Sequence, residues 1–437
     1  MTSAEVRDDW VPKQDYISET FAELEGKRLW PRVWQMACRE EEIPSVGDFV
    51  VYEIVEDSIV IVRSSGREIR AFFNVCQHRG RQLVEGCGHI AQFVCRYHGW
   101  KYTLDGRCSF IADADDWGGQ LSCNDMGLKP VRVSTWGGFV FINMDENAEP
   151  LENFLSPVIK RCEKFEFEKM RFFWYRTFRY PCNWKVAIEG FDESYHVQQS
   201  HPQLLEHIKD NTQSRTFGLH GNQYWNFPAI SRFGPADRLN KAADPDHRTH
   251  ALAYHKEIHD QLGAMTTPRT YRAIQRIVDE VPANASPAEV VGKMREYQRE
   301  AAEADGAGFP DITPEYMAAS GFNWHVFPNL VFQHLAIDGL LFYRTRPDGK
   351  NVDSCLFDVW SLVRYAPGKE PPLKREFYED WHECAEMGRI LTQDFVNLDA
   401  VQRGMKSRGF HGARTNPVQE RSVSNLHRSL RVFLDDA

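Results

Sequence analysis

Short hydrophobic runs separated by turn-forming residues dominate the chain from about residue 46 to residue 145. The clearest runs are DFVVYEIV, SIVIVRSS, IRAFFNVC, QFVCRYHGW and GGFVFINM. Runs of this length, rich in Val, Ile, Phe and Tyr and bounded by Gly, Ser and Asn, are typical of β-strands. The pattern therefore predicts a small all-β domain here.

Other segments repeat their apolar residues at helical spacing. Residues 13–37 do so behind an early serine that can cap a helix. Residues 235–318 are charged and Ala-rich with little strand character, and segments around 371–404 and 419–435 also have helical spacing. We expect helices in all four.

Strand-like runs return in the second half of the chain. RFFWYRTFRYPCNWK begins at residue 171, and residues 322–349 and 354–367 read as strands of an antiparallel sheet. The fold class predicted is α+β, with an all-β domain and a larger domain whose antiparallel sheet is flanked by helices. The predicted boundaries are 1–45 for a helical segment that packs on the larger domain, 46–150 for the β domain and 151–437 for the larger one.

Composition narrows the class of protein. The chain has 437 residues, of which 42% are hydrophobic and 13% aromatic, so we expect a globular protein. Its net charge of −10 argues against nonspecific nucleic-acid binding, which needs a positive field. The acidic start MTSAEVRDDWVPKQDY lacks the apolar core of a signal peptide, and no apolar run approaches the roughly 20 residues of a membrane span. The expected location is the cytoplasm.

Two loops of the β domain combine cysteine with histidine. CQHRG places Cys76 and His78 together, and CRYHGW places Cys95 and His98 together, with sixteen residues between His78 and Cys95. Two cysteines and two histidines also suit zinc, but a zinc finger takes a Cys pair and then a His pair. One Cys and one His from each loop instead suit a Rieske [2Fe–2S] cluster, in which one iron takes both thiolates and the other both imidazoles.

The other residues near these loops are given structural roles. Cys87 has no partner with matched spacing and is expected to be a structural cysteine, with His89 a surface residue. Trp100 is expected to pack beside the cluster. A framework of disulfides is not expected among the ten cysteines of a chain of this length in the cytoplasm.

The stretch IEGFDESYHVQQSHP, residues 188–202, holds a second candidate metal site. Glu193 and Asp192 precede His196 by three and four residues, so both acids share its face on a helix and spacing does not choose between them. His201 would point away on an unbroken helix. Pro202 disfavours the helical conformation at His201, so the helix should end there and let His201 turn back.

Two histidines and one carboxylate on one face of an iron form the facial triad of non-haem Fe(II) oxygenases. The leading candidate for the carboxylate is Asp394, in the helical segment LTQDFVNLDAVQRG, with Asp399 as its competitor. A helix cap is the alternative role for either aspartate.

Taken together, these motifs resemble the Rieske non-haem iron oxygenases, and in particular the large (α) subunit of aromatic ring-hydroxylating oxygenases. The resemblance extends over nearly the whole chain and includes FPN at 327–329, RPDG at 346–349 and QDFVNLDAVQRG. It implies that Cys76, His78, Cys95 and His98 bind a [2Fe–2S] cluster and that His196, His201 and Asp394 bind a mononuclear Fe(II).

The resemblance also gives Glu193 a catalytic role. The acid at this position in the family bridges the first iron histidine, here His196, and a cluster histidine of a neighbouring subunit, here His98. Many members have aspartate there, so Glu193 keeps the charge and changes the reach. Glu189 and Asp192 are then expected to form an ordinary acidic helix face.

The function implied is that of a terminal oxygenase. It would take electrons from a reductase, with or without a ferredoxin, and ultimately from NAD(P)H, and use O₂ to hydroxylate an aromatic or other apolar small molecule. Oxidative N- or O-demethylation, or attack on a quaternary ammonium substrate, is the alternative, and an electron-transfer or zinc protein without oxygenase activity is a third. A homotrimer is expected, with or without a small β subunit, and the insertion at 235–318 should lie near the site entrance.

Overall fold

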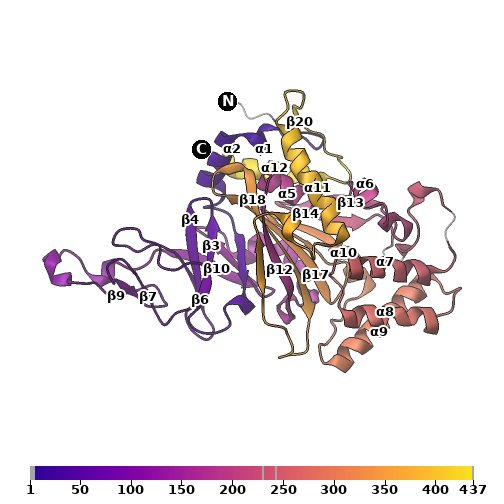
Figure 1. The fold of residues 1–437 in the computed structure, drawn as a ribbon, viewed down its shortest axis with the longest axis horizontal. Coiled ribbons are helices and arrows are strands. Elements are labelled where there is room, and N and C mark those ends of the chain that lie inside the picture. The colour runs from indigo at the N-terminus through magenta and orange to yellow at the C-terminus, as the bar shows by residue number, and fades with distance from the viewer. Residues whose placement is uncertain (1–4, 229–230, 242–243, 436–437) are drawn as a thin grey trace. The chain divides into compact units, whose positions relative to one another are not determined.

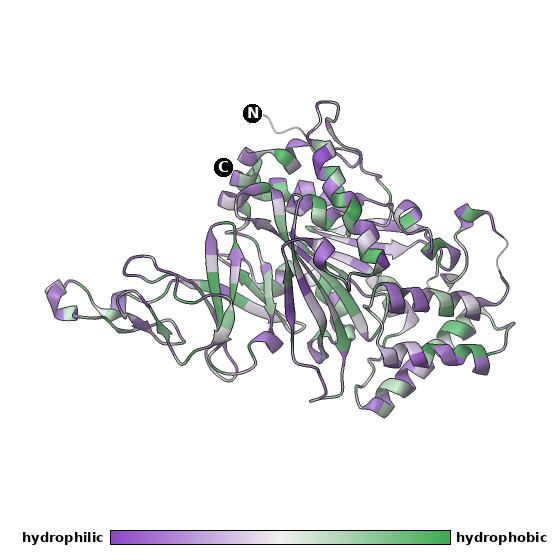
Figure 2. Ribbon diagram, viewed as in Figure 1, coloured by the Kyte–Doolittle hydropathy of each residue, from purple (hydrophilic) through white to green (hydrophobic). Residues whose placement is uncertain are grey.

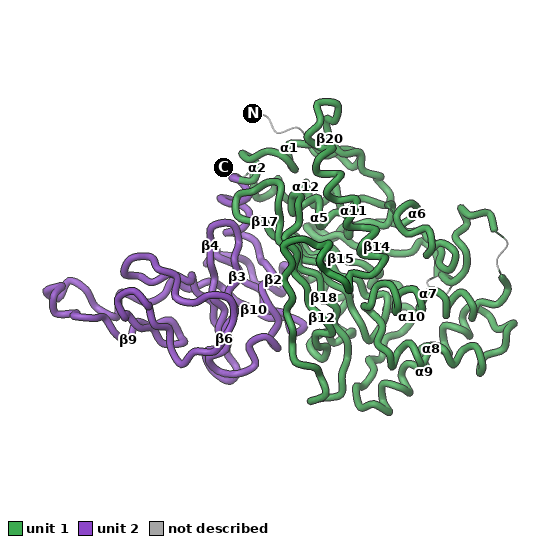
Figure 3. Tube along the Cα trace, in the orientation of Figure 1, with its two compact units in different colours: residues 1–22, 155–437 green, residues 23–154 purple. Residues whose placement is uncertain are grey.

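The computed structural model describes residues 5–228, 231–241 and 244–435, and the chain folds into two compact units (Figures 1 and 3). The smaller is Glu23–Phe154, and the larger comprises the preceding residues with everything from Leu155 onward. This division differs from the predicted boundary at residue 46. The helical pattern ends in a π-helical turn at Glu25–Leu29, and the next strand, Gln35–Arg39, joins the sheet of the smaller unit.

The smaller unit is built on two β-sheets, as predicted. The strand order of the seven-stranded sheet is β2-β11-β10-β5-β4-β3-β6, and that of the three-stranded sheet is β7-β8-β9. All these pairs are antiparallel. The strands are β2 (Gln35–Arg39), β3 (Asp48–Ile54), β4 (Asp57–Arg63), β5 (Ile69–Phe73), β6 (Cys87–His89), β7 (Phe93–Val94), β8 (Lys101–Tyr102), β9 (Cys108–Phe110), β10 (Pro130–Trp136) and β11 (Phe139–Asn143).

A hydrophobic core fixes the two Cys-x-His and Cys-x-x-His loops of this unit. Phe72, Phe93 and Tyr102 are at most 3% exposed and belong to the same cluster of buried side chains as Cys76 and Cys95. Since close-packed interiors leave side chains little freedom, this core holds both loops in place.

The larger unit contains an eight-stranded sheet in the order β13-β14-β15-β16-β17-β18-β12-β19. Its pairs are antiparallel except β12 with β19, which is parallel. The predicted helix from residue 371 is wrong at its start, because this segment adds strand β19 to the sheet edge. The strands are β12 (Met170–Tyr180), β13 (Thr212–Phe217), β14 (His220–Trp225), β15 (Asn323–Val326), β16 (Leu330–Gln333), β17 (Gly339–Asp348), β18 (Asn351–Arg364) and β19 (Arg375–Tyr378).

Helices cover this sheet and form the predicted insertion. Within residues 235–318, of which 242–243 lie outside the described residues, four α-helices begin, and α8 and α9 carry both hydrophobic and hydrophilic residues along their length (Figure 2). Strands β1 (Val11–Pro12) and β20 (Gly412–Ala413) pair with each other. The α-helices of the described residues, of which α3 belongs to the smaller unit, are α1 (Gln14–Ile17), α2 (Glu19–Leu24), α3 (Leu151–Phe154), α4 (Ser156–Cys162), α5 (Trp184–Glu189), α6 (Val197–Ser200), α7 (His247–Gln261), α8 (Pro268–Glu280), α9 (Pro287–Asp305), α10 (Pro314–Ser320), α11 (Gly388–Met405) and α12 (Arg421–Leu434).

The packing of three helices positions the candidate site. Helix α5 lies on β17 and β18, and α11 contacts both α5 and α7. Segments near residues 190, 255 and 394 are thereby brought together. Among the described residues, no helix is both long and apolar enough to cross a lipid bilayer.

Candidate metal centres

The stretch 188–202 is a helix, a turn and a second short helix. Helix α5 ends at Glu189 and α6 begins at Val197, so the predicted shared helical face does not exist. The Glu193 carboxylate accepts hydrogen bonds from the backbone N–H groups of Tyr195 and His196, which favours a turn over a continued helix. The predicted helix end at His201, the residue before Pro202, is confirmed.

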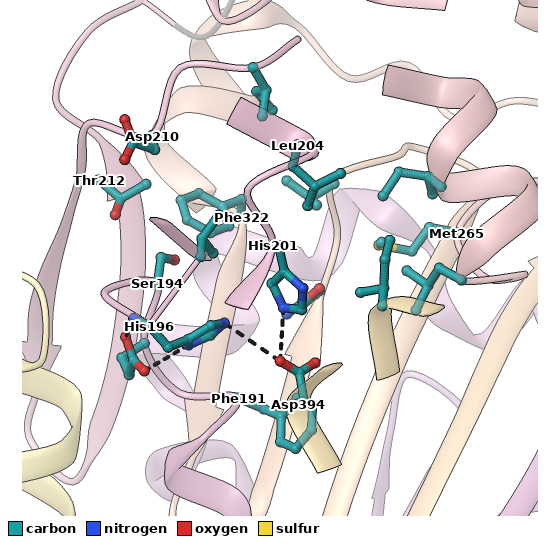
Figure 4. A pocket seen from close by; sticks show the side chains of 18 of the residues that line it. Phe191, Ser194, His196, His201, Leu204, Asp210, Thr212, Met265, Phe322 and Asp394 are labelled. Carbon is teal, nitrogen blue, oxygen red and sulfur yellow. Dashed lines mark hydrogen bonds and ion pairs between the residues drawn. The ribbon is translucent and has the colours of Figure 1, made fainter. Parts of the chain in front are cut away.

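This turn brings two histidines toward an aspartate from α11 (Figure 4). The Nε2 atom of His201 lies 2.8 Å from Oδ1 of Asp394, and Nε2 of His196 lies 3.8 Å from the same oxygen. One ligand atom from each of the three residues falls within 4.8 Å of the other two. Two imidazole nitrogens and a carboxylate oxygen at these separations are a donor set that suits a non-haem Fe(II).

The second nitrogen of each imidazole ring is held by another side chain. Nδ1 of His196 lies 2.7 Å from Oε1 of Glu193, and Nδ1 of His201 lies 2.9 Å from Oε1 of Gln393. Bonds of this kind fix the tautomer and leave Nε2 free to bind a metal. Sequence reasoning found Glu193 and missed Gln393, whose only signal is its place beside Asp394.

The charge of the site favours a cation. Burial lowers the pKa of His196, but the carboxylates of Glu193 and Asp394 outweigh burial and raise this pKa to about 9. An imidazole whose charged form is favoured in a buried place reports a negative environment. The same negative environment would attract a divalent metal ion.

The competing aspartate lies elsewhere on α11. Asp399 forms an ion pair with Arg403, one helical turn further on. The side chain of Asp394 is 9% exposed and that of Asp399 is 34% exposed. The structure therefore places Asp394, and not Asp399, beside the two histidines.

The expected acidic helix face at Glu189 and Asp192 is wrong, because Asp192 is buried and the Glu189 side chain is only 13% exposed. Asp192 is 1% exposed and its Oδ2 lies 3.2 Å from Nδ1 of the buried His325. Glu189 accepts hydrogen bonds from the hydroxyl of Tyr16 and from Nε2 of His427, at 2.9 and 2.6 Å. The turn after Glu189 directs these acids into the interior instead of toward solvent.

A cavity opens beside the three converging residues. Figure 4 shows Phe322, Leu204 and Met265 arranged around His201 and Asp394. Helix α7 contributes Tyr254 and Ile258 to the wall. The apolar side chains of the wall are Phe191, Val197, Leu204, Ile208, Trp225, Tyr254, Ile258, Leu262, Met265, Phe322, Leu335, Tyr343 and Ile390.

The Cys–His loops of the smaller unit offer a second set of donors. Cys76 and Cys95 are each 2% exposed, and the rings of His78 and His98 lie 4.5 Å apart between centroids. Nδ1 of each ring is buried and has no hydrogen-bond partner among the described residues. Two buried ring nitrogens without partners beside two buried thiols fit the thiolate and imidazole ligands of a Rieske cluster.

Nearby residues support these loops. The indole of Trp100 stacks on the ring of His78 at 4.9 Å and 8°, and the hydroxyl of Tyr102 lies 3.3 Å from the sulfur of Cys76. His89 is a surface residue, as predicted, with a side chain 63% exposed, and Cys87 is also exposed.

Family models match both units. The model described as "Ring hydroxylating alpha subunit (catalytic domain)" matches residues 167–436, and the model described as "Rieske [2Fe-2S] domain" matches residues 33–118. The start of the second match, at residue 33, agrees with the place of β2 in the smaller unit.

Named relatives align with part of the chain. The glycine betaine monooxygenase oxygenase subunit of Pseudomonas aeruginosa (strain UCBPP-PA14) is 34% identical over 45% of this chain and 46% of its own length. The carnitine monooxygenase oxygenase subunit of Escherichia coli (strain K12) is 33% identical over 48% and 57%. The chain thus spans about half the length of these relatives.

Solved structures show the same fold over almost the whole chain. The quaternary ammonium Rieske monooxygenase CntA in complex with L-carnitine superposes with a TM-score of 0.65 at 19% identity, covering 98% of this chain and 96% of the other. Naphthalene 1,2-dioxygenase from Rhodococcus sp. superposes with a TM-score of 0.63 at 20% identity, covering 97% and 94%.

Proposed function

Because this chain belongs to the family of ring-hydroxylating oxygenase alpha subunits, we propose that it is the terminal oxygenase of a Rieske-type system. It takes electrons that originate from NAD(P)H and uses O₂ to oxidise a small molecule. The observation that carries the proposal is the convergence of His196, His201 and Asp394 on the wall of an apolar cavity. We expect iron at these three residues because the [2Fe–2S] cluster proposed for the Rieske domain would supply electrons to it.

The chain's own residues have separate tasks. Cys76, His78, Cys95 and His98 hold the [2Fe–2S] cluster, while His196, His201 and Asp394 hold the mononuclear iron. When bound, the cluster supplies one-electron transfer and the iron supplies the activation of O₂. Glu193 and Gln393 orient the two imidazoles, and the apolar wall excludes water and positions the substrate.

Glu193 has a further role in the proposal, as the bridge by which electrons reach the mononuclear site. Its Oε1 holds His196, and its side chain is 9% exposed. In the assembly it would meet His98 of the partner subunit. This path requires a ring of subunits, so we propose a homotrimer, to which a small β subunit can be added.

The cavity favours an aromatic or other apolar substrate. The carboxylates in its wall are already engaged: Glu193 with His196, Asp394 with His201, and Asp210 with Arg238 at 2.5 Å. Most of the remaining wall is hydrocarbon and aromatic rings, which bind apolar surface.

A quaternary ammonium substrate, or oxidative N- or O-demethylation, is the second candidate. The rings of Trp225 and Phe322 lie 4.5 Å apart in the cavity wall, and aromatic faces attract quaternary ammonium groups. Lys209 also lines the cavity and could pair with a carboxylate of such a substrate. The similarity to glycine betaine and carnitine monooxygenase subunits supports this candidate.

The partners follow from the reaction. Electrons come one at a time from a reductase, directly or through a ferredoxin. Such a donor and its nicotinamide are found in the cytoplasm, where we place the protein.

The proposal is tested by reconstituting the purified protein with iron, sulfide and a Rieske-type reductase. Product formation is measured on a panel of aromatic compounds and methylated ammonium compounds, because the two substrate candidates give different products. A two-iron cluster without a third iron, and iron content unchanged by His196→Ala, would instead favour an electron-transfer protein. Zinc in place of both centres would refute the proposal.

A further inference from the structure

A second cavity lies against His196 and Asp394, two of the three converging residues. Gly190, Glu193, His196 and Asp394 line both cavities, and the other residues of the second wall are different. It contains several polar side chains, among them a carboxylate that the proposed function does not use, Glu420. These polar side chains are Glu189, Ser200, Asn397, Arg414, Thr415 and Glu420.

We propose that this second cavity is the route by which protons reach the oxygen site, and that Glu420 is the positioning residue that holds and passes them. The inference rests on the proposed oxygenase function and adds to it the source of protons. Glu420 acts through the second cavity and does not itself bind the metal.

The reaction requires protons whichever substrate is used. Hydroxylation converts one C–H bond and O₂ into C–OH and water, consuming two electrons and two protons. Addition of both oxygen atoms to an aromatic ring, giving a dihydrodiol, also consumes two electrons and two protons. The reductase supplies the electrons one at a time, so the protons must enter separately from solvent.

The substrate cavity is a poor source of these protons. Its carboxylates are already engaged: Asp210 pairs with Arg238, Glu193 holds His196, and Asp394 belongs to the proposed metal ligands. Burial raises the pKa of the Tyr254 hydroxyl to about 12, and burial together with Asp394 raises that of Tyr343 well above its ordinary value. Phenols with such pKa values keep their protons at neutral pH.

Glu420 is placed to exchange protons. It precedes α12, and its Oε2 accepts a hydrogen bond from the backbone N–H of Asn416 at 2.6 Å. Among the described residues, no hydrogen bond is formed to its Oε1, while the side chain lines the second cavity. A carboxyl with one anchored oxygen and a second oxygen without a hydrogen bond, in a cavity wall that also carries other polar side chains, can take a proton and release it without changing its position.

The charges around Glu420 support this role. Burial and the nearby carboxylates of Glu193 and Glu189 raise its pKa to about 7, against the lowering effects of the Asn416 N–H and of His196. Arg414 is the cationic side chain in the same wall. A group that is half protonated near neutral pH is the most effective at transferring protons there.

Glu420→Gln tests the inference, with Glu420→Asp as the conservative variant and the exposed Glu370→Gln as the matched control. Each protein is reconstituted with both metal centres and checked for iron content. We then measure product formed per O₂ consumed, hydrogen peroxide released, the solvent deuterium isotope effect and the pH profile of turnover. Glu420→Gln should keep its iron, form at least fivefold less product per O₂, release more peroxide and show a larger isotope effect. Glu420→Asp should restore most of the coupling, that is, the product formed per O₂ consumed.

A measurement on the metal-free protein gives an independent readout. Infrared difference spectra between pH 5 and 9 should show a carboxyl group that titrates near neutral pH in the wild type and is missing from Glu420→Gln. Coupling, isotope effect and pH profile equal to those of the wild type would overturn the inference, as would a Glu420 carboxyl that titrates near pH 4.5. If the wild type itself forms no product from any substrate, the proposed function fails and the infrared result still reports on Glu420.

Discussion

Replacing Gln393 by methionine tests whether an uncharged side chain outside the proposed ligand set controls iron binding. Gln393 accepts a hydrogen bond at Oε1 from Nδ1 of His201 over 2.9 Å, and His201 is 3% exposed. Methionine keeps the length of the side chain but removes the acceptor. When Nε2 of His201 binds metal, Nδ1 must carry the hydrogen, and the variant leaves this buried donor without a partner.

The size of the effect follows from that unpaired donor. A buried donor without an acceptor costs about 1–3 kcal/mol. The metal-free protein escapes this cost because His201 can then move its proton to the other nitrogen, so the cost appears in metal binding. At about 1.4 kcal/mol per tenfold change, iron affinity should fall roughly 5- to 150-fold. Losses of about 10- to 100-fold are usual for groups that orient a ligand.

The assay is competition for Fe(II) between the protein and a chelator of known affinity, under anaerobic conditions. The exposed Gln199→Met is the matched control and should bind iron as the wild type does. The spectrum of the Rieske cluster should be the same in all three proteins. An iron affinity for Gln393→Met within twofold of the wild type would refute the reasoning, because it would mean that the hydrogen bond to Nδ1 does not orient His201.

Three further predictions concern separate parts of the molecule. His196→Ala should lose the mononuclear iron and keep the two cluster irons, measured by iron quantification and by the cluster spectrum; an unchanged iron content would contradict the proposed ligand set. Glu193→Gln should keep both metal centres and largely stop turnover, measured as product formation under reductase; near-normal turnover would remove the bridge role. Burial lowers the pKa of His334 to about 3, so the unfolded chain takes up a proton that the folded chain does not. The contribution of His334 to the free energy of unfolding should therefore be fully present above about pH 6.5 and decrease at lower pH, by about 2 kcal/mol at pH 5. In urea unfolding, His334→Phe should lack this part of the pH dependence. If the free energy of unfolding changed equally with pH in both proteins, His334 would have to be solvated.

The β domain and its two Cys–His loops were predictable because their signals are local. Cys76 and His78 are two residues apart, and the hydrophobic runs around them have the period of strands. The end of the helix at His201 was predictable for the same reason, since Pro202 acts on its immediate neighbour.

Two predictions failed where local spacing was applied across a change of structure. The pattern at residues 13–37 is helical only as far as Leu29, and strand β2 then pairs with β11, about a hundred residues later. Helical periodicity placed Glu189 and Asp192 on a solvated face, whereas Asp192 is buried and the Glu189 side chain is only 13% exposed. In each case partners distant in the chain outweighed the local preference.

The sequence by itself determined which chemical groups are present and the local segments that carry them: two Cys–His loops, two histidines ahead of a proline, and two candidate aspartates. Only the tertiary structure decided that Asp394 and not Asp399 meets the histidines, and that Gln393 holds His201 across 192 residues of chain. The packing of α11 against α5 makes that choice. Spacing within one helix says which side chains share a face, but which face meets another element depends on the packing of the whole core.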